Sequence, residues 1–309
     1  MNIIQVAFNA IAPTFLYVVA GYFCKCVGVI HENEQPRMNS IGFKVFLPLM
    51  LFYEIYSSEI PYGQGVDVLI FNVIAIFCVY GLVCLFVLRV EKEGRRRGVM
   101  TQAIFRSNYV LLGLPIVTAL YPEAAGVVSL SIAFAVPIFN MLAVIALEMF
   151  NGSHTGLGSV LRNIGKNPLI IASLLGMLFM FTGLRLPLFL EKACAKFSGI
   201  ATPYLLFWLG CFFRVRFRFD RALFYCLSGR LLVVPAIVLT IAAWMGFRNG
   251  EFATVMALFA TPTATSSFTM AQQLDGDAEL AGNTVVLGCA LSFFTILGWL
   301  CLFMALGIL

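Results

Sequence analysis

Residues 106–115 read Arg-Ser-Asn-Tyr-Val-Leu-Leu-Gly-Leu-Pro and place a polar triplet and a Gly-x-Pro sequence inside one apolar segment. A second stretch of this kind, Ala-Thr-Pro-Thr-Ala-Thr-Ser-Ser, occupies residues 260–267. Proline removes a backbone donor and clashes with the preceding turn, so each stretch predicts a break in a helix. Broken helices within membranes occur where they line a cavity, because lipid cannot satisfy the freed backbone groups. The alternative is a pair of ordinary proline kinks.

The composition places both stretches in a membrane protein. Apolar residues make up 61% of the 309 residues and charged residues 11%, and the mean hydropathy is +0.95. Soluble proteins average roughly 45–50% apolar and about 25% charged residues, so this chain has too few charges to cover a soluble surface. The apolar excess also excludes a disordered chain. The first apolar run is too long for a signal peptide, and we interpret it as the first span.

A spanning helix needs about 20 mainly apolar residues, and ten segments satisfy this requirement. We therefore predict an all-α polytopic protein with short connections and no room for a soluble domain. The fourth and ninth segments are the poorest helices, because each contains polar residues and a central proline. The predicted spans are residues 3–24, 40–58, 66–89, 101–121, 125–149, 167–184, 190–213, 222–245, 252–273 and 279–305.

Positive charge sets the orientation of the spans. With the N-terminus outside, fifteen of the 20 Lys and Arg residues face the cytoplasm and four lie outside, which leaves Arg230 within a span. The loop between spans 9 and 10 is an exception, because it is predicted to be cytoplasmic and yet is acidic. Both termini are predicted to be external. The cytoplasmic set is Lys25, Arg37, Lys44, Arg89, Lys92, Arg95, Arg96, Arg97, Arg106, Arg162, Lys166, Arg214, Arg216, Arg218 and Arg221.

The prolines indicate an internal repeat. Pro13 and Pro48 are 35 residues apart, as are Pro168 and Pro203, and Pro115 then pairs with Pro262. Five spans in each half is an odd number, so the second half must run opposite to the first. Inverted repeats are typical of secondary transporters. We predict a first repeat over 1–150, a cytoplasmic linker over 151–166 and a second repeat over 167–309. Half-helix N-termini at the two breaks would present positive dipole ends, which suit an anion.

At these residues the chain resembles the auxin efflux carrier family, which includes bacterial organic-anion permeases and the plant PIN proteins. Family members place an asparagine seven residues before the crossover proline, as Asn108 precedes Pro115 here. The long central loop of many plant members is missing, which favours a compact bacterial-type carrier of the inner membrane. The matching segments are Phe46–Phe52 (FLPLMLF), Ser107–Ile116 (SNYVLLGLPI), Lys166–Gly176 (KNPLIIASLLG) and the segment around Pro262.

The resemblance implies a fold like that of bile-acid and sodium/proton carriers. Spans 1, 2, 6 and 7 would form a scaffold, often dimeric, and spans 3–5 and 8–10 a transport unit. Helices 4 and 9 would cross in that unit, and its movement would resemble an elevator.

The candidate substrate site lies at the predicted crossing. Asn108 either binds substrate or satisfies a freed carbonyl of its own helix. The Ser and Thr hydroxyls after Pro262 either line the site or bond back within their helix. Asn140 and Asn283 either face the crossing or join helices. The full candidate set is Asn108, Gly113, Pro115, Asn140, Thr261, Pro262, Thr263, Thr265, Ser266, Arg230 and Asn283.

Two charged residues leave alternatives open. Arg230 is the one Lys or Arg well inside an apolar run, and intramembrane charges are usually paired or functional. It would balance an anionic substrate or extend to the cytoplasmic edge. Glu54, near the outer end of span 2, is a scaffold or interface residue or a proton-coupling group.

We therefore expect a secondary transporter of a small organic anion, with proton, sodium or no coupling ion. The alternatives are an anion channel and a membrane receptor. The chain has no Walker-type GxxxxGK[ST] sequence, no HExxH and no GxSxG, which argues against an ATPase and an intramembrane enzyme. Cys24 and Cys26 are the only close cysteine pair and have no neighbouring histidine, so no metal site, cofactor or disulfide framework is predicted. The net charge of +5 reflects membrane topology and not a nucleic-acid partner.

Overall fold

The computed structural model describes residues 3–31, 34–58, 65–150, 162, 165–212 and 219–309, with the backbone alone for residues 3–11 and 35. The predicted linker and Arg214, Arg216 and Arg218 lie wholly or largely outside this described part. Within it the regular secondary structure is helical apart from one isolated bridge. The α-helices are α1 (Ile3–Cys26), α2 (Gln35–Ile41), α3 (Leu47–Tyr56), α4 (Val66–Val90), α5 (Gly94–Phe105), α6 (Leu114–Leu120), α7 (Ala125–Phe150), α9 (Pro168–Thr182), α10 (Leu188–Phe212), α11 (Arg221–Ser228), α12 (Val234–Trp244), α13 (Asn249–Ala260), α14 (Ser266–Gln273) and α15 (Ala278–Ala305).

Three wide helical turns share one cause. The π-helical turns η2 (Gly42–Phe46), η3 (Tyr109–Gly113) and η5 (Gly229–Val233) each end two residues before a proline, at Pro48, Pro115 and Pro235. Proline lacks the N–H that the α-helix needs and crowds the carbonyl of the preceding turn. A π-turn widens the helix at that point, so the chain stays helical through all three prolines.

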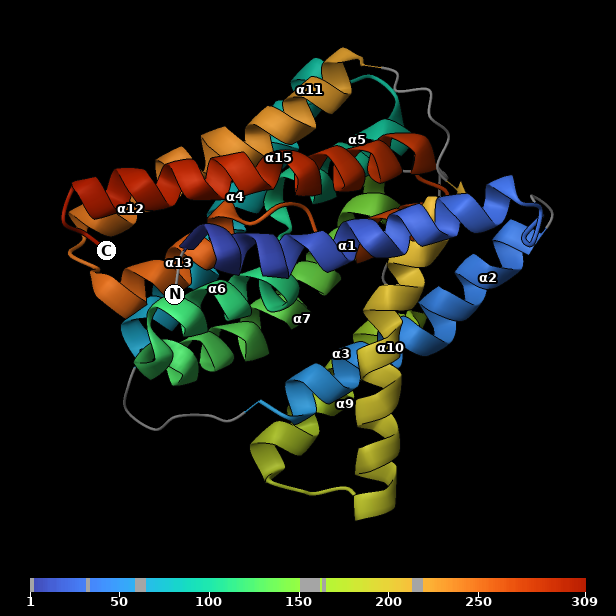
Figure 1. The fold of residues 1–309 in the computed structure, drawn as a ribbon, viewed down its shortest axis with the longest axis horizontal. Coiled ribbons are helices and arrows are strands. Elements are labelled where there is room, and N and C mark those ends of the chain that lie inside the picture. The colour runs from blue at the N-terminus through green and yellow to red at the C-terminus, as the bar shows by residue number, and fades with distance from the viewer. Residues whose placement is uncertain (1–2, 32–33, 59–64, 151–161, 163–164, 213–218) are drawn as a thin grey trace.

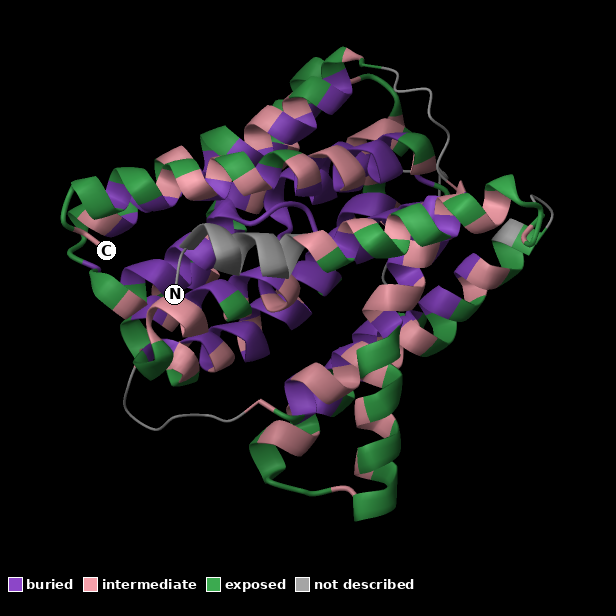
Figure 2. Ribbon diagram, viewed as in Figure 1, coloured by how far each residue is buried: buried purple, intermediate pink, exposed green. Residues whose placement is uncertain are grey.

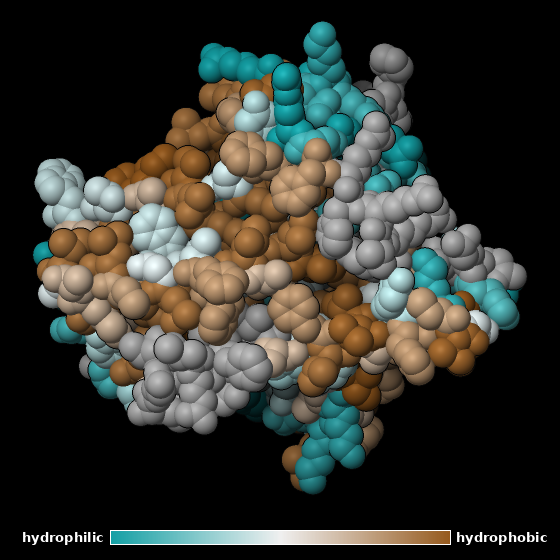
Figure 3. Space-filling view, turned by 45° about the horizontal axis from the view of Figure 1, so that its top comes forward, coloured by the Kyte–Doolittle hydropathy of each residue, from teal (hydrophilic) through white to brown (hydrophobic). Residues whose placement is uncertain are grey.

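The surface is that of a membrane protein. Figure 3 shows a broad hydrophobic band on one face, with hydrophilic groups above and below it. Large apolar side chains are exposed along its helices, including Phe294 at 70% and Trp244 at 87%, whereas soluble monomers rarely expose large apolar patches. By length and composition, five described helices can cross a membrane: Pro36–Tyr56, Val66–Val90, Pro122–Phe150, Arg221–Trp244 and Ala278–Ala305. Helices also occupy the other segments predicted as spans, but the ten-span membrane assignment stays a prediction.

The helices pack as two groups (Figure 1). In the first group α1 packs along α10, and α3 packs along both α9 and α10. In the second group, α4, α5 and α7 pack together beside the helices α11–α15. Buried residues concentrate in the second group, whereas the end of α9 and the start of α10 are exposed (Figure 2).

The packing of α1 against α10 requires glycine. A Cβ atom on Gly21 would lie 1.8 Å from the carbonyl oxygen of Phe207, and one on Gly210 would lie 2.0 Å from that of Val18. The α3–α9 packing repeats this arrangement more loosely, because a Cβ atom on Gly176 would lie 3.0 Å from the carbonyl oxygen of Phe52.

An ion-pair cluster joins three connections at one end of the second group. Arg96, at the start of α5, contacts Glu91, Asp220 and Asp277. Asp220 and Asp277 also accept the N-terminal N–H groups of α11 and α15, from Leu223 and Leu280. The acidic connection before α15 therefore lies beside the arginine-rich connection before α5.

Candidate functional site

The two polar stretches meet backbone to backbone. The N–H of Asn108 donates to the carbonyl oxygen of Pro262 at 2.8 Å, and Ser107 and Thr263 form an antiparallel bridge. The chain is extended at Arg106 (φ −89°, ψ 132°) and at Thr261 (φ −73°, ψ 153°). Two interrupted helices, one ending at Phe105 and one at Ala260, therefore meet here, at the place of the predicted crossing.

The first break lies earlier than the sequence suggested. The helix stops at Phe105 and resumes at Tyr109, whereas Gly113 and Pro115 stand in continuous helix. The wide turn η3 accommodates Pro115 without a break. Pro262 lies within its break, between α13 and α14, so the two prolines are not placed alike relative to the interruptions.

Arg230 terminates both interrupted helices. It is 1% exposed, and its guanidinium donates to the carbonyl oxygens of four residues. These lie at the C-terminal ends of α5 and α13, where carbonyls lack helical partners and the helix dipole is negative. The acceptors are Thr261 (2.8 Å), Leu258 (2.9 Å), Phe105 (3.2 Å) and Ile104 (3.4 Å). The cation therefore holds the crossing together from the side of the C-termini.

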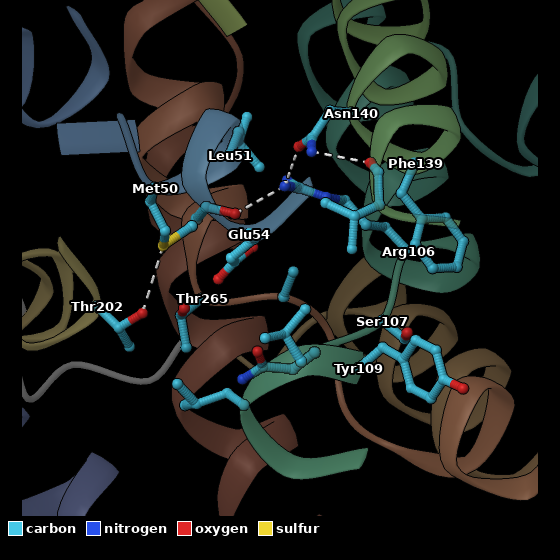
Figure 4. Close-up of a pocket in the computed structure, with 16 residues that line it drawn as sticks. Met50, Leu51, Glu54, Arg106, Ser107, Tyr109, Phe139, Asn140, Thr202 and Thr265 are labelled. Atoms are coloured by element: carbon cyan, nitrogen blue, oxygen red, sulfur yellow. Dashed lines mark hydrogen bonds between the residues drawn. The ribbon is translucent and has the colours of Figure 1, made fainter. Parts of the chain in front are cut away.

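A cavity of about 50 Å³ lies on another side of the crossing. This volume is several times the roughly 10–15 Å³ that one water needs. Sixteen residues line it, from both helix groups (Figure 4). They are Met50, Leu51 and Glu54 of α3, Thr202 of α10, Val136, Phe139 and Asn140 of α7, and Arg106, Ser107, Asn108, Tyr109, Val110, Leu111, Ala264, Thr265 and Ser266 of the crossing.

Arg106 supplies the positive charge of this cavity. The sequence placed it with the cytoplasmic cluster, and that prediction is wrong, because Arg106 is 4% exposed and lines the cavity. Its Nη2 donates to Asn140 Oδ1 at 2.5 Å and to Ser266 Oγ at 2.7 Å. Asn140 Nδ2 in turn donates to the carbonyl oxygen of Val136. These partners are neutral, so they position Arg106 without offsetting its charge beside the cavity.

Asn108 brings an unused donor to the same place. It is 7% exposed, and its side-chain NH₂ has no hydrogen-bond partner. The hydroxyl of Ser107 is likewise buried without a partner. Leaving a buried polar group unsatisfied costs about 1–3 kcal/mol, so unpartnered donors beside a guanidinium favour a ligand that accepts hydrogen bonds.

Glu54 faces Arg106 across the cavity (Figure 4). Its carboxylate interacts electrostatically with Arg106. Within the described part of the chain, no ion pair joins the two groups and no donor is hydrogen-bonded to the carboxylate. The carboxylate and the guanidinium therefore lie more than 4 Å apart, and both line the cavity.

The structure divides the predicted site residues. Asn108, Asn140, Thr265 and Ser266 line the cavity. Thr261 and Thr263 lie at the crossing, where their hydroxyls donate to the carbonyls of Ala257 and Ala103, and Pro262 accepts from Asn108. Gly113 and Pro115 stand in the following helix. Asn283 lies apart, beside the Arg96 ion-pair cluster.

Sequence reasoning did not include Arg106 or Glu54 in the site. Arg106 immediately precedes the Ser-Asn pair of the broken segment, which was the available signal. Among the described residues no group of three or more His, Cys, Asp or Glu is arranged to hold a metal ion.

Two interrupted helices that meet in an apolar helical protein, beside a charged and partly unsatisfied cavity, are typical of a membrane transporter. The comparison with protein families agrees. The chain belongs to the family described as membrane transport protein, that of the auxin efflux carriers, whose model matches residues 6–158 and 154–300.

Two archaeal relatives match nearly the whole chain. An uncharacterized transporter of Methanocaldococcus jannaschii is 22% identical over 321 residues, which covers 96% of this chain and 98% of the relative. An uncharacterized transporter of Methanothermobacter thermautotrophicus is 22% identical over 300 residues, covering 94% and 96%. Both relatives are archaeal, so they lend no support to the expected bacterial inner membrane.

Proposed function

We propose that this transporter is a secondary carrier that moves a small organic anion, a carboxylate, through the cavity at the helix crossing. The unpartnered NH₂ group of Asn108 beside Arg106 carries this proposal. A carboxylate accepts hydrogen bonds at both oxygens, so it would satisfy Asn108 and Ser107 and neutralise Arg106 at once.

The helix ends favour the same sign of charge. The segment after the second break begins at Ser266, so the N-terminus of α14 adjoins the cavity. Helix N-termini attract anions. The opposite, negative ends of α5 and α13 are already satisfied by Arg230. The helix end that remains beside the cavity is the N-terminus of α14, whose dipole favours an anion.

The two helix groups support alternating access. The first group (α1–α3, α9 and α10) corresponds to the scaffold and the second (α4–α7 and α11–α15) to the transport unit of an inverted repeat. The α1–α10 and α3–α9 pairs are equivalent in that repeat, and a glycine lies at the contact in each. Because the cavity lies between the groups, an elevator-like movement of the unit would carry the anion past the scaffold. A homodimer through the exposed apolar faces of α9 and α10 belongs to the same proposal.

The experiment measures binding and transport of labelled lactate, succinate and benzoate by purified protein. Asn108→Ala should weaken binding about tenfold or more, because a hydrogen bond to a charged group contributes roughly 1.5–3 kcal/mol. Arg106→Gln should abolish binding. Asn72→Ala is the matched control, since Asn72 is also a buried amide in the transport unit but does not line the cavity.

In proteoliposomes, unlabelled anion on the far side should stimulate uptake of the labelled anion, which a carrier allows and a channel does not. Near-native binding by monodisperse Asn108→Ala and Arg106→Gln proteins would refute the site. Single-channel currents would refute the carrier.

A further inference from the structure

Glu54 and Arg106 give the cavity a balance of charge that the proposed function leaves unexplained. These are the two charged residues among the sixteen that line it, and they come from different helix groups, Glu54 from α3 and Arg106 from the crossing. Their formal charges cancel when the cavity is empty. An entering monoanion would add one uncompensated negative charge to a site enclosed by helices, where such a charge is costly.

Arg106 is the one cation among the residues that line the cavity, and Arg185 lies over the ring of Tyr56 instead. On its own helix the titratable neighbours are Tyr53 and Tyr56, and from the crossing Arg106 and Tyr109 face the cavity. The neighbouring α9 has no titratable residue, and α10 presents Thr202 to the cavity. The other charged residues of the elements packed on α3 do not line the cavity: Lys44 of η2, Glu148 of α7, and Glu191, Lys192 and Lys196 of α10.

Proton uptake at Glu54 restores the balance. Since no described donor is hydrogen-bonded to the carboxylate, nothing holds it in the ionised form except the charge of Arg106 across the cavity. A bound anion takes over that charge, and the carboxylate is then left opposite another negative group. A like charge nearby favours protonation of a carboxylate.

We propose that Glu54 binds one proton together with each substrate anion, so that the carrier is an anion–proton symporter; this rests on the proposed function. The proton adds to a carboxylate oxygen of Glu54, the substrate carboxylate pairs with Arg106, and the loaded cavity carries the same net charge as the empty one. The bound proton is released on the far side when the anion leaves and Glu54 again faces Arg106.

The test measures binding of lactate, succinate and benzoate by detergent-purified protein between pH 6 and pH 9. Lactate and benzoate have a pKa near 4, so they stay ionised throughout and contribute no pH dependence. For lactate and benzoate, the Kd of the wild-type protein should rise about tenfold per pH unit above the pKa of Glu54. In that same pH range, about one proton should be taken up per bound monoanion, as read by a pH indicator in weakly buffered solution.

Glu54→Gln imitates the protonated form and should bind these anions at pH 9 as tightly as the wild type does at low pH, without proton uptake. Glu54→Asp should keep the proton uptake. Glu123→Gln, a change to an exposed carboxylate, should behave as the wild type. If the wild type binds the probes with no pH dependence, or if Glu54→Gln still takes up a proton, the proton coupling is refuted while the anion site stands. If no probe binds at any pH, the proposed function itself fails.

Discussion

The backbone N–H of Asn108 donates to the carbonyl oxygen of Pro262 across 2.8 Å, and this bond joins the two halves of the chain where their helices are interrupted. It uses the backbone of Asn108 and leaves its side chain free. The backbone bond to the partner segment thereby positions the side-chain amide, whose NH₂ group stays available for a ligand. The cavity therefore depends on an intact crossing, and the crossing depends on Arg230.

Arg230→Met should prevent folding or strongly lower the apparent melting temperature. It would leave four carbonyl oxygens at buried helix ends without donors, each at a cost of about 1–3 kcal/mol. Arg230→Lys should be intermediate, since one ammonium cannot reach two helix ends as the planar fork does. The measurement is thermal unfolding followed by size-exclusion chromatography.

Arg248→Met is the matched control for this experiment. Arg248 also donates to two carbonyls, those of Ala243 and Phe247, but at an exposed position where water can replace it. A stable Arg230→Met protein that has lost anion binding would contradict the structural role and would indicate that Arg230 binds the substrate.

Gly21→Ala and Gly210→Ala should each destabilise the protein. Their Cβ atoms would lie 1.8 and 2.0 Å from backbone carbonyl oxygens, so α1 and α10 would have to separate, and overpacking typically costs 1–3 kcal/mol. Gly199→Ala, in the same α10 helix, should be tolerated because its Cβ atom would meet nothing within 4 Å. Equal melting temperatures for all three variants would mean that α1 and α10 are not in this close contact.

The Arg96 ion-pair cluster should give the protein an acid-sensitive contribution to stability. Burial tends to raise the pKa of Asp220, but hydrogen bonds from the Leu223 N–H and from Arg96, together with the Arg96 charge, hold this pKa below its ordinary value. A carboxyl whose pKa is lower in the folded than in the unfolded protein stabilises the folded state. This contribution is fully present above the pKa of the unfolded state, about 4 for aspartate. It disappears as the pH falls through the pKa of the folded state.

Asp220→Asn should therefore lower the apparent melting temperature at pH 7. Below about pH 4, the melting temperature of the variant should approach that of the wild type. Asp275→Asn, at an exposed aspartate outside the cluster, is the control. A constant difference between Asp220→Asn and the wild type from pH 7 to pH 3 would show that the charge of Asp220 does not matter.

Reporter fusions after Arg97 and after Leu309 should report opposite sides of the membrane, with Arg97 cytoplasmic. Arg97 lies near the Arg96 cluster, whereas the C-terminus packs beside the start of α13, where Asn249 N–H donates to the carbonyl oxygen of Ile308. The same side for both reporters would exclude the ten-span topology.

The crossing was predictable because its signal is local. A proline and a run of polar residues inside an apolar segment can be recognised without knowing the rest of the chain, and the two stretches lie side by side at the Ser107–Thr263 bridge. The position of the first break was wrong because a π-turn before Pro115 keeps that helix continuous.

The charges were not predictable in the same way. Arg106 follows a basic connection, so its position in the sequence suggested that it belongs to the cytoplasmic cluster. Hydropathy does not show toward which face of a helix a side chain points. The partners of Arg230 are backbone carbonyls up to 126 residues away, and a carbonyl has no sequence signature. Whether Glu54 faces lipid, the scaffold or the cavity is decided by packing between helices that the sequence does not place relative to one another.

The hydrogen bonds of Arg230 have a consequence for the relation between the two halves. In the proposed repeat, α4 corresponds to α11 and α12, but α4 has no Lys or Arg before Arg89. The guanidinium of Arg230, which belongs to the second half, donates hydrogen bonds to helix ends of both halves. Two copies of the first half would leave those ends without a donor, and two copies of the second would bring two cations to one crossing. The halves have become complementary, and neither can substitute for the other.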